Sequence, residues 1–248
     1  MSAPIAPSGP AAAGAAAQVF VEDLDAPALS VDDAHHLARV LRLRAGELVV
    51  AADGRGRWRP TVFRVGVPTL EPVGPVAVEP RPPAAVTVGF VPVKGDRPEW
   101  VVQKLTEAGV DRIVVMRSAR AVVRWRADRA ERAMERLGRV AREAAAQSRR
   151  VWVPEVIGIL DPGEMAAWLA PAPLALADPG GVPPGPATAA VAVGPEGGWE
   201  ASELASATER VGLGPGILRA ETAALGVGVL LCAIRDGVVR PAHGDRVG

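Results

Sequence analysis

The sequence predicts an α/β protein with a mostly parallel sheet, preceded by a small β-rich domain. Three observations support this prediction. Residues 19–78 contain short β-type apolar runs and one helical pattern, strands and helices alternate from residue 84 onward, and three prolines lie between residues 80 and 83. Strands that alternate with helices favour a parallel sheet with helices on both faces.

The domain boundaries follow from these composition changes. The Ala- and Pro-rich start suggests a flexible tail over residues 1–18. We expect a β domain over residues 19–80 and an α/β domain over residues 84–248. The prolines between them are typical of a linker.

In the first domain, the runs LVVAADGRGRWRPTVF (48–63) and FRVGV (63–67) predict strands. The Asp53-Gly54 pair between apolar stretches is a hairpin signal. The segment VDDAHHLARVLRLRAGE (31–47) predicts a helix capped by Asp32 or Asp33 and ending near Gly46.

This helix would be amphipathic. At 100° per residue, one face carries the apolar side chains of Leu37, Val40 and Leu41. The opposite face carries three basic candidates for RNA contact, His35, Arg39 and Arg42. A solvated helix face is an equally good interpretation of that cationic surface.

The second domain should contain four strands and three long helices. The predicted strands are 84–93, 112–118, 173–181 and 187–193, the predicted long helices are 96–110, 128–148 and 220–235, and a short helix should follow residue 198. Two Gly-rich loops, 194–198 and 212–216, fall at predicted strand ends, where ligands bind in parallel sheets. GPEGG is not a phosphate loop, since no Lys-Ser/Thr pair follows it. It is also not the glycine motif of a dinucleotide-binding fold, because that motif follows the first strand of the sheet and GPEGG comes after most of the strands. By itself it could also be a structural turn.

Composition limits the other classes of function. The chain has 248 residues, one cysteine (Cys232) and three histidines, so we expect neither disulfides nor a metal site. We read no signal peptide and no membrane span, and we expect a cytoplasmic protein with no membrane partner. The net charge is zero, but residues 112–150 hold twelve arginines against four acids, a surface that could hold a polyanion.

Several motifs together carry a family resemblance. They are KGDRPEWVVQKLTEAGVDRI, RSARAVVRW, EAAAQSRRVWVPEV, VAVGPEGGWEASELA and GLGPGILRAETAALGVGVLL. This combination resembles the RsmE family of ribosomal RNA uridine-N3 methyltransferases, from about residue 19 to residue 237. The resemblance implies a SPOUT fold, whose parallel sheet carries a trefoil knot, and an N-terminal PUA-like β-barrel that binds RNA.

The function implied by this resemblance is methylation of N3 of a uridine in 16S rRNA near the decoding centre. S-adenosylmethionine would be the cofactor, the assembled small ribosomal subunit the substrate, and a homodimer the active form. Two alternatives stay open: a related SPOUT methyltransferase acting on another RNA, and a catalytically inactive RNA-binding or assembly factor.

The resemblance also implies where S-adenosylmethionine binds. Backbone groups of the knotted loops would hold the adenine, and a β-carbon would obstruct that approach. The cofactor-binding candidates are Ala177, Asp178, Gly194, Pro195, Glu196, Gly197, Gly198, Leu213, Gly214, Ile217, Leu218 and Arg219.

For catalysis, the candidates are Arg219 and Glu221. A guanidinium beside a uracil carbonyl would stabilise the anion that forms as N3 loses its proton. Glu221 would orient Arg219 or accept that proton, although it also suits the acidic first turn of a helix.

Five further arginines are candidates for RNA contact, either as phosphate ligands or as idle solvated charge: Arg117, Arg120, Arg124, Arg126 and Arg149. Two positions depart from the family pattern. Gln18-Val19-Phe20 stands where the family has an arginine before its first aromatic strand, and Trp199 stands where phenylalanine is more common.

Overall fold

A computed structural model of the chain describes residues 9–93, 97–123, 125 and 127–239. It forms two compact units. The first holds the chain up to Pro82 together with residues 142–153, and the second holds the remainder. Residues 142–153 therefore cluster with the β-rich unit, although they follow residue 84 in the sequence.

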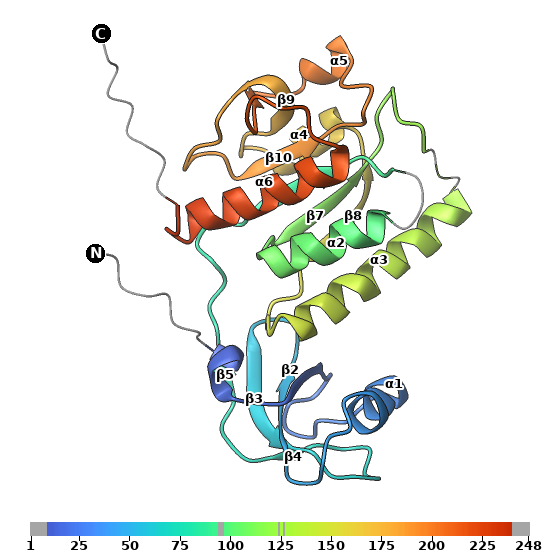
Figure 1. Cartoon of the computed structure of the whole chain (residues 1–248), viewed down its shortest axis with the longest axis vertical. Helices are drawn as coiled ribbons and strands as arrows, with labels where there is room; N and C mark the ends of the chain where they lie inside the picture. The colour runs from blue at the N-terminus through green and yellow to red at the C-terminus, as the bar shows by residue number, and fades with distance from the viewer. Residues whose placement is uncertain (1–8, 94–96, 124, 126, 240–248) are drawn as a thin grey trace. The chain divides into compact units, whose positions relative to one another are not determined.

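The first unit is built on a five-stranded sheet in the order β1-β2-β3-β4, with β5 also paired to β3. The strands are β1 (Ala17–Phe20), β2 (Leu48–Ala52), β3 (Arg57–Val62), β4 (Glu71–Pro72) and β5 (Ala77–Val78), after a short 3₁₀ helix, η1 (Gly9–Ala13). β2 and β3 form the predicted hairpin, since they pair antiparallel across Asp53-Gly54 (Figure 1). The strand predicted over 63–67 is wrong, because the chain turns at Val65-Gly66 instead of extending.

The predicted long helix is shorter than its pattern. It consists of α1 (Val31–His35) and η2 (His36–Val40), the latter a π-helical turn. The cap is Ser30, whose hydroxyl accepts from the amide of Asp33 at 3.0 Å, and not Asp32 or Asp33 as expected. Arg42 ends the segment in the left-handed region with φ 55°, well before Gly46.

This early end changes the predicted faces. The wider π turn shifts the side chains that follow it relative to a regular helix. Leu37 is completely buried, whereas Val40 is 59% exposed, so the apolar face is narrower than predicted. His35 and Arg39 lie on the helical segment, but Arg42 lies beyond its end.

The second unit contains a six-stranded sheet in the order β11-β9-β10-β6-β7-β8. The strands are β6 (Thr87–Phe90), β7 (Arg112–Met116), β8 (Glu155–Leu160), β9 (Ala175–Val182), β10 (Ala190–Val193) and β11 (Glu209–Val211). All five pairings are parallel. The predicted parallel α/β sheet is confirmed.

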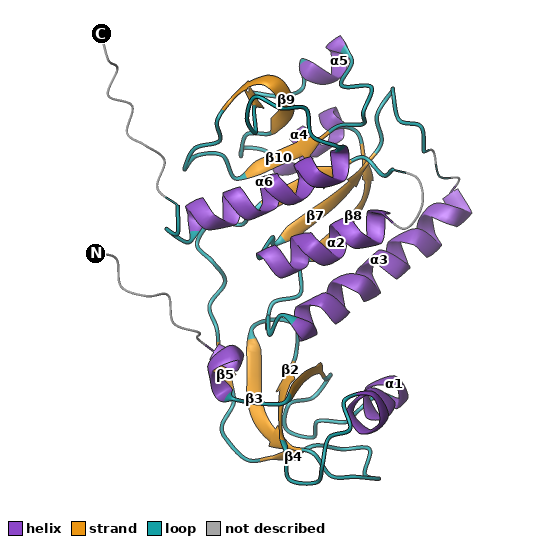
Figure 2. Ribbon diagram, in the orientation of Figure 1, coloured by secondary structure: helices purple, strands orange, loops and turns teal. Residues whose placement is uncertain are grey.

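Helices cover both faces of this sheet (Figure 2). They are α2 (Arg97–Ala108), α3 (Ala127–Gln147), α4 (Pro162–Leu169), α5 (Ala201–Leu204) and α6 (Ala220–Arg235). Alternate strand residues point to opposite cores: Ile113 and Val115 pack with α2, α3 and α6, whereas Val114 and Met116 pack with α4. This period of two is the pattern of a strand buried on both faces.

In the second unit, the sequence prediction lacked β8, α4 and β11. β8 lies at the edge of the sheet, and none of its residues is fully buried, so it lacks a strong apolar run. β11 has three residues and is too short to give a periodic signal. The final helix, predicted over 220–235, has those bounds.

Candidate cofactor-binding site

The middle of β9, the segments that follow β10 and β11, and the start of α6 line a cavity of about 300 Å³. This volume is near the lower end of the range for small-molecule sites, which is about 300–1,000 Å³. Eleven of the twelve predicted cofactor residues line it: Ala177, Asp178, Gly194, Pro195, Glu196, Gly198, Leu213, Gly214, Ile217, Leu218 and Arg219. The structure thus brings together segments that are up to about forty residues apart in the sequence.

Trp199 fixes two of these segments to each other. Its indole N–H donates to the carbonyl oxygen of Ala177 at 3.1 Å, and its side chain is 8% exposed. A β-carbon on Gly194 would lie 2.8 Å from the Trp199 ring. At Gly194, therefore, an indole of the protein itself already excludes a side chain.

The two other central glycines of the loops differ from each other. Gly214 has φ 127°, a conformation that other residues rarely adopt, and a β-carbon there would meet no protein atom within 4 Å. Gly197 is the one predicted cofactor residue that does not line the cavity. It faces Arg120 instead, and its carbonyl oxygen accepts from Arg120 Nη1 at 2.9 Å.

Asp178 is a partly buried acid at the cavity wall. Its Oδ1 accepts from the amide of Gly180 at 2.9 Å, which is the turn-forming role that its sequence context suggests. Its Oδ2 lies 3.8 Å from Arg210 Nη1 on β11. The acid is therefore held from two sides while it contributes to the cavity.

The two catalytic candidates lie at the start of α6. Arg219 is the N-cap residue with an extended backbone, and its exposed side chain lines the cavity. Glu221 belongs to the first turn, is not among the residues that line the cavity, and pairs with Arg97 at the start of α2, at 3.2 Å. The second carboxylate oxygen of Glu221 is buried without a hydrogen-bond partner among the described residues. The sequence analysis missed Arg97 as the partner of Glu221.

The basic candidates in the second unit are engaged by neighbouring groups. Arg117 Nη2 pairs with Asp161 at 2.9 Å and with Glu164 at 2.7 Å, and these carboxylates raise the pKa of its guanidinium. Arg120 supports the Gly197 carbonyl, as described above. Arg124 and Arg126 lie outside the described residues.

In the first unit, His35, Arg39 and Arg42 are all exposed. Arg149 is different, because its guanidinium donates to the carbonyl oxygens of Ala15 and Ala16 at 3.0 and 2.9 Å. Burial lowers the pKa of this guanidinium. Arg149, with φ 62°, thus holds the segment that leads into β1.

The part of the chain that the structure describes contains neither a candidate metal site nor a membrane-spanning helix. No group of three or more histidine, cysteine or acidic residues is placed to hold a metal ion. Over the same residues, every helix is too short or too polar to span a bilayer.

Comparison with known proteins identifies the family. A model of the RNA methyltransferase domain matches residues 80–231, and a model of the RNA methyltransferase PUA domain matches residues 29–62. Ribosomal RNA small subunit methyltransferase E of Mycobacterium bovis is 36% identical over 219 residues, covering 78% of this chain and 80% of its own. The chain belongs to the RsmE family.

Other members support the same assignment. The Bacillus subtilis RsmE is 28% identical over 81% of this chain and 88% of its own. The crystal structure of the RsmE from Neisseria gonorrhoeae, bound to S-adenosylmethionine, is 26% identical, with a TM-score of 0.75 over 88% of this chain and 97% of its own. The predicted fold class, a knotted SPOUT sheet with a PUA-like domain, is confirmed.

The cavity suits the cofactor of this RsmE family. Ala177, Val193 and Leu213 contribute apolar groups to its lining, and four of its lining residues are glycines, which have no side chain to cover the backbone: Gly194, Gly198, Gly214 and Gly216. An adenine ring needs apolar contact on its faces and hydrogen-bonding backbone at its edge. The residues present therefore fit S-adenosylmethionine.

Proposed function

We propose that this protein transfers the methyl group of S-adenosylmethionine to N3 of a uridine in the 16S rRNA of the small ribosomal subunit. The observation that carries the proposal is the cavity lined by β9, the segments after β10 and β11, and the start of α6, in a chain of the RsmE family. The Neisseria relative is bound to S-adenosylmethionine.

The chemical demands on the protein are modest. When bound, S-adenosylmethionine supplies a methyl group activated by its sulfonium. The protein must hold the base in line with that methyl group and favour loss of the N3 proton. Arg219, exposed at the cavity, is placed to stabilise negative charge on a uracil carbonyl.

Glu221 acts beside Arg219 in this proposal. Its ion pair with Arg97 holds the carboxylate at the start of α6, which leaves the second oxygen without a hydrogen-bond partner among the described residues. A buried carboxylate oxygen with free acceptor capacity can take a proton or hold one in transit. We assign it the role of proton acceptor and not that of a partner of Arg219.

The RNA is held mainly through its backbone. N3 is the Watson–Crick donor of uracil, so the base must be unpaired or extruded. Residues 19–80 form the RNA-binding domain, where His35, Arg39 and Arg42 contact phosphates, and residues 84–248 form the catalytic domain. Because phosphate contacts recognise shape, the assembled small subunit is a better substrate than short naked RNA.

The active form is a homodimer in the cytoplasm. α6 is apolar around much of its circumference, and Val229 on α6 and Ile217 before it are 50% and 90% exposed. Gly228 allows close packing within the chain, because a β-carbon there would lie 2.5 Å from Leu105 of α2. Light scattering at micromolar concentration should give twice the monomer mass, and a fully active monomer would contradict the dimer.

A methylation assay tests the proposed function. Small subunits from a strain that lacks this gene are incubated with the protein and S-adenosylmethionine, and the rRNA is mapped by reverse transcription. Methylation at N3 blocks the Watson–Crick edge, so one new strong stop at a uridine is expected. Binding of S-adenosylmethionine without transfer would indicate an RNA-binding or assembly factor, and methylation of a ribose or of another RNA would indicate a related SPOUT enzyme.

A further inference from the structure

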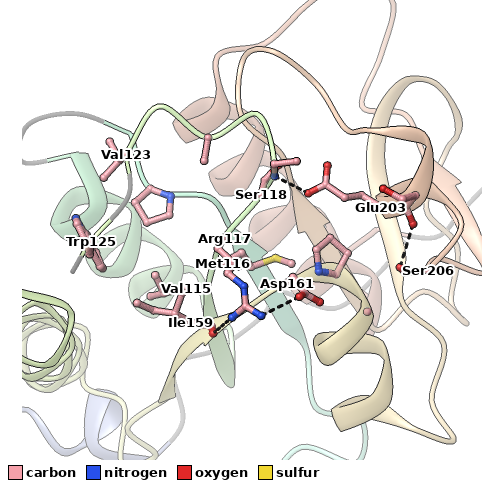
Figure 3. A pocket seen from close by; sticks show the side chains of 16 residues that line it. Val115, Met116, Arg117, Ser118, Val123, Trp125, Ile159, Asp161, Glu203 and Ser206 are labelled. Carbon is pink, nitrogen blue, oxygen red and sulfur yellow. Dashed lines mark hydrogen bonds and ion pairs between the residues drawn. The ribbon is translucent and has the colours of Figure 1, made fainter. Parts of the chain in front are cut away.

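A second cavity lies in the same unit, at the carboxyl ends of β7 and β8, and it has about 580 Å³ of volume (Figure 3). The segment after β7 and helix α5 form its walls. None of its lining residues also lines the cofactor cavity. It is therefore a separate site, to which neither the proposed cofactor nor the methyl transfer assigns a ligand.

The clearest sign of a ligand is Ser118. This residue is 8% exposed, lines the cavity, and its hydroxyl oxygen has no hydrogen-bond partner among the described residues. A buried hydroxyl without a partner costs about 1–3 kcal/mol, so such groups are uncommon unless a ligand or water satisfies them. The hydroxyl of Ser118 can both donate and accept.

The remaining lining indicates a planar, uncharged ligand. Met116 and Ile159 give apolar walls, and the indole of Trp125 lies at one side of the cavity, as Figure 3 shows. Arg117 contributes no free charge, because two carboxylates pair with its guanidinium. Arg117 and the two carboxylates that pair with it, those of Asp161 and Glu164, together carry a net negative charge. This side of the cavity therefore disfavours a phosphate and tolerates a neutral group.

The position of the cavity connects it to the cofactor loop. The amide of Ala119 donates to Glu203 of α5 at 3.0 Å, and Arg120 donates to the carbonyl of Gly197 at 2.9 Å. The segment that walls the second cavity therefore also supports the loop 194–198. A ligand here would lie beside the methyl-transfer site but outside it.

We propose that this cavity receives an extruded nucleobase of the substrate RNA, next to the nucleotide that is methylated. The inference rests on the proposed function, because it takes the RNA as the partner. Single-stranded bases are commonly recognised by stacking on an aromatic side chain and by hydrogen bonds to their edges. Trp125 supplies the stacking surface and Ser118 the edge contact. Since the methylated base must touch the cofactor, the base in this cavity is a neighbour of the target.

Three variants test the proposal. For each variant, we measure methylation of small subunits from a strain that lacks the gene, and the affinity for S-adenosylmethionine by titration. Trp125→Leu removes the stacking surface, and we expect KM for subunits to rise about tenfold or more. Ser118→Ala should raise it about fivefold. Since the hydroxyl has no partner within the described chain, this variant should not lower Tm, which separates loss of a ligand contact from loss of folding. Ser202→Trp fills the cavity from the exposed rim and should also raise KM.

The control is Trp168→Leu, which removes an exposed tryptophan on α4 outside both cavities. It should leave KM unchanged, and the affinity for S-adenosylmethionine should be that of the wild type in all four variants. If the wild type fails to methylate subunits, the proposed function itself fails. If the wild type is active and the three cavity variants keep its KM, the base pocket is excluded.

A second measurement identifies the occupant. Bound subunits are treated with reagents that modify the Watson–Crick edges of unpaired bases. The wild type should change the reactivity of one base adjacent to the target, and Ser202→Trp should restore the unbound pattern at that base. A raised KM with no such base would mean that another component of the subunit enters the cavity, which would overturn the proposal.

Discussion

The indole N–H of Trp199 donates to the carbonyl oxygen of Ala177 at 3.1 Å, and this bond ties the loop after β10 to β9. The two residues are far apart in the sequence, yet the bond closes one side of the cofactor cavity. A phenylalanine at this position could pack on Gly194 but could not donate this bond. The affinity for S-adenosylmethionine should therefore depend on the indole nitrogen.

The first prediction is that Trp199→Phe weakens binding of S-adenosylmethionine about fivefold. The change keeps an aromatic ring on Gly194 and removes one hydrogen bond, worth about 1 kcal/mol. Isothermal titration measures the affinity, and Trp168→Phe on the exposed side of α4 is the control. Equal affinity in the wild type and Trp199→Phe would show that packing alone positions Ala177.

The second prediction concerns Gly214. Gly214→Val places a β-branched residue at φ 127° and directs its methyl groups into space that no protein atom occupies. We expect a loss of about 1–3 kcal/mol in stability and no detectable binding of S-adenosylmethionine. Gly46→Val is the matched control, since that glycine has φ 93°, lies outside the cavity, and a β-carbon there also meets nothing within 4 Å. A soluble Gly214→Val protein that binds normally would exclude this loop as the cofactor site.

The third prediction separates an RNA contact from a solvated face at Arg39 and Arg42. Changing both to alanine should weaken binding to the small subunit and reduce the slope of log affinity against log salt by about 0.7–0.9 for each lost phosphate contact. Arg64→Ala is the control, because Glu71 already pairs with that guanidinium at 2.6 Å. An unchanged slope in the double variant would identify a solvated face. The affinity for S-adenosylmethionine should not change in either protein.

The fourth prediction is a pH dependence of stability at Glu164. The backbone N–H of Asp161 and then the guanidinium of Arg117 hold the pKa of this carboxyl below its ordinary value of 4.5. Because the folded pKa is depressed, the contribution is present above pH 4.5 and is lost as the pH falls through the folded pKa. Tm measured from pH 6 to pH 3 should therefore fall less steeply for Glu164→Gln than for the wild type.

The control for the pH experiment is Glu209→Gln, which changes an exposed carboxyl on β11. Its Tm profile should follow that of the wild type. If Glu164→Gln also follows the wild type, the contacts of Glu164 with Asp161 and Arg117 do not contribute to acid stability.

Much of the fold could be predicted from local patterns. The apolar strands of the second unit and the helix over 220–235 have strong periodicity, because each is buried against the same parallel sheet. The first helix was mispredicted for the opposite reason. Its register changes at a π turn, and its end depends on a left-handed Arg42 instead of a glycine, so neither event leaves a compositional signal.

The sequence by itself determined the α/β class of the protein, because the apolar period of each strand and helix reflects its burial in the sheet, and the resemblance of its motifs to the RsmE family led to the prediction of the cofactor loops. Only the tertiary structure decided which side chains meet. It showed that an indole fills the space beside Gly194, that Glu221 pairs with Arg97, and that Arg149 holds the chain before β1. These relationships join segments distant in sequence, and a side chain's partner depends on which elements the fold places beside it. A linear pattern records which side chains are available but not which of them meet.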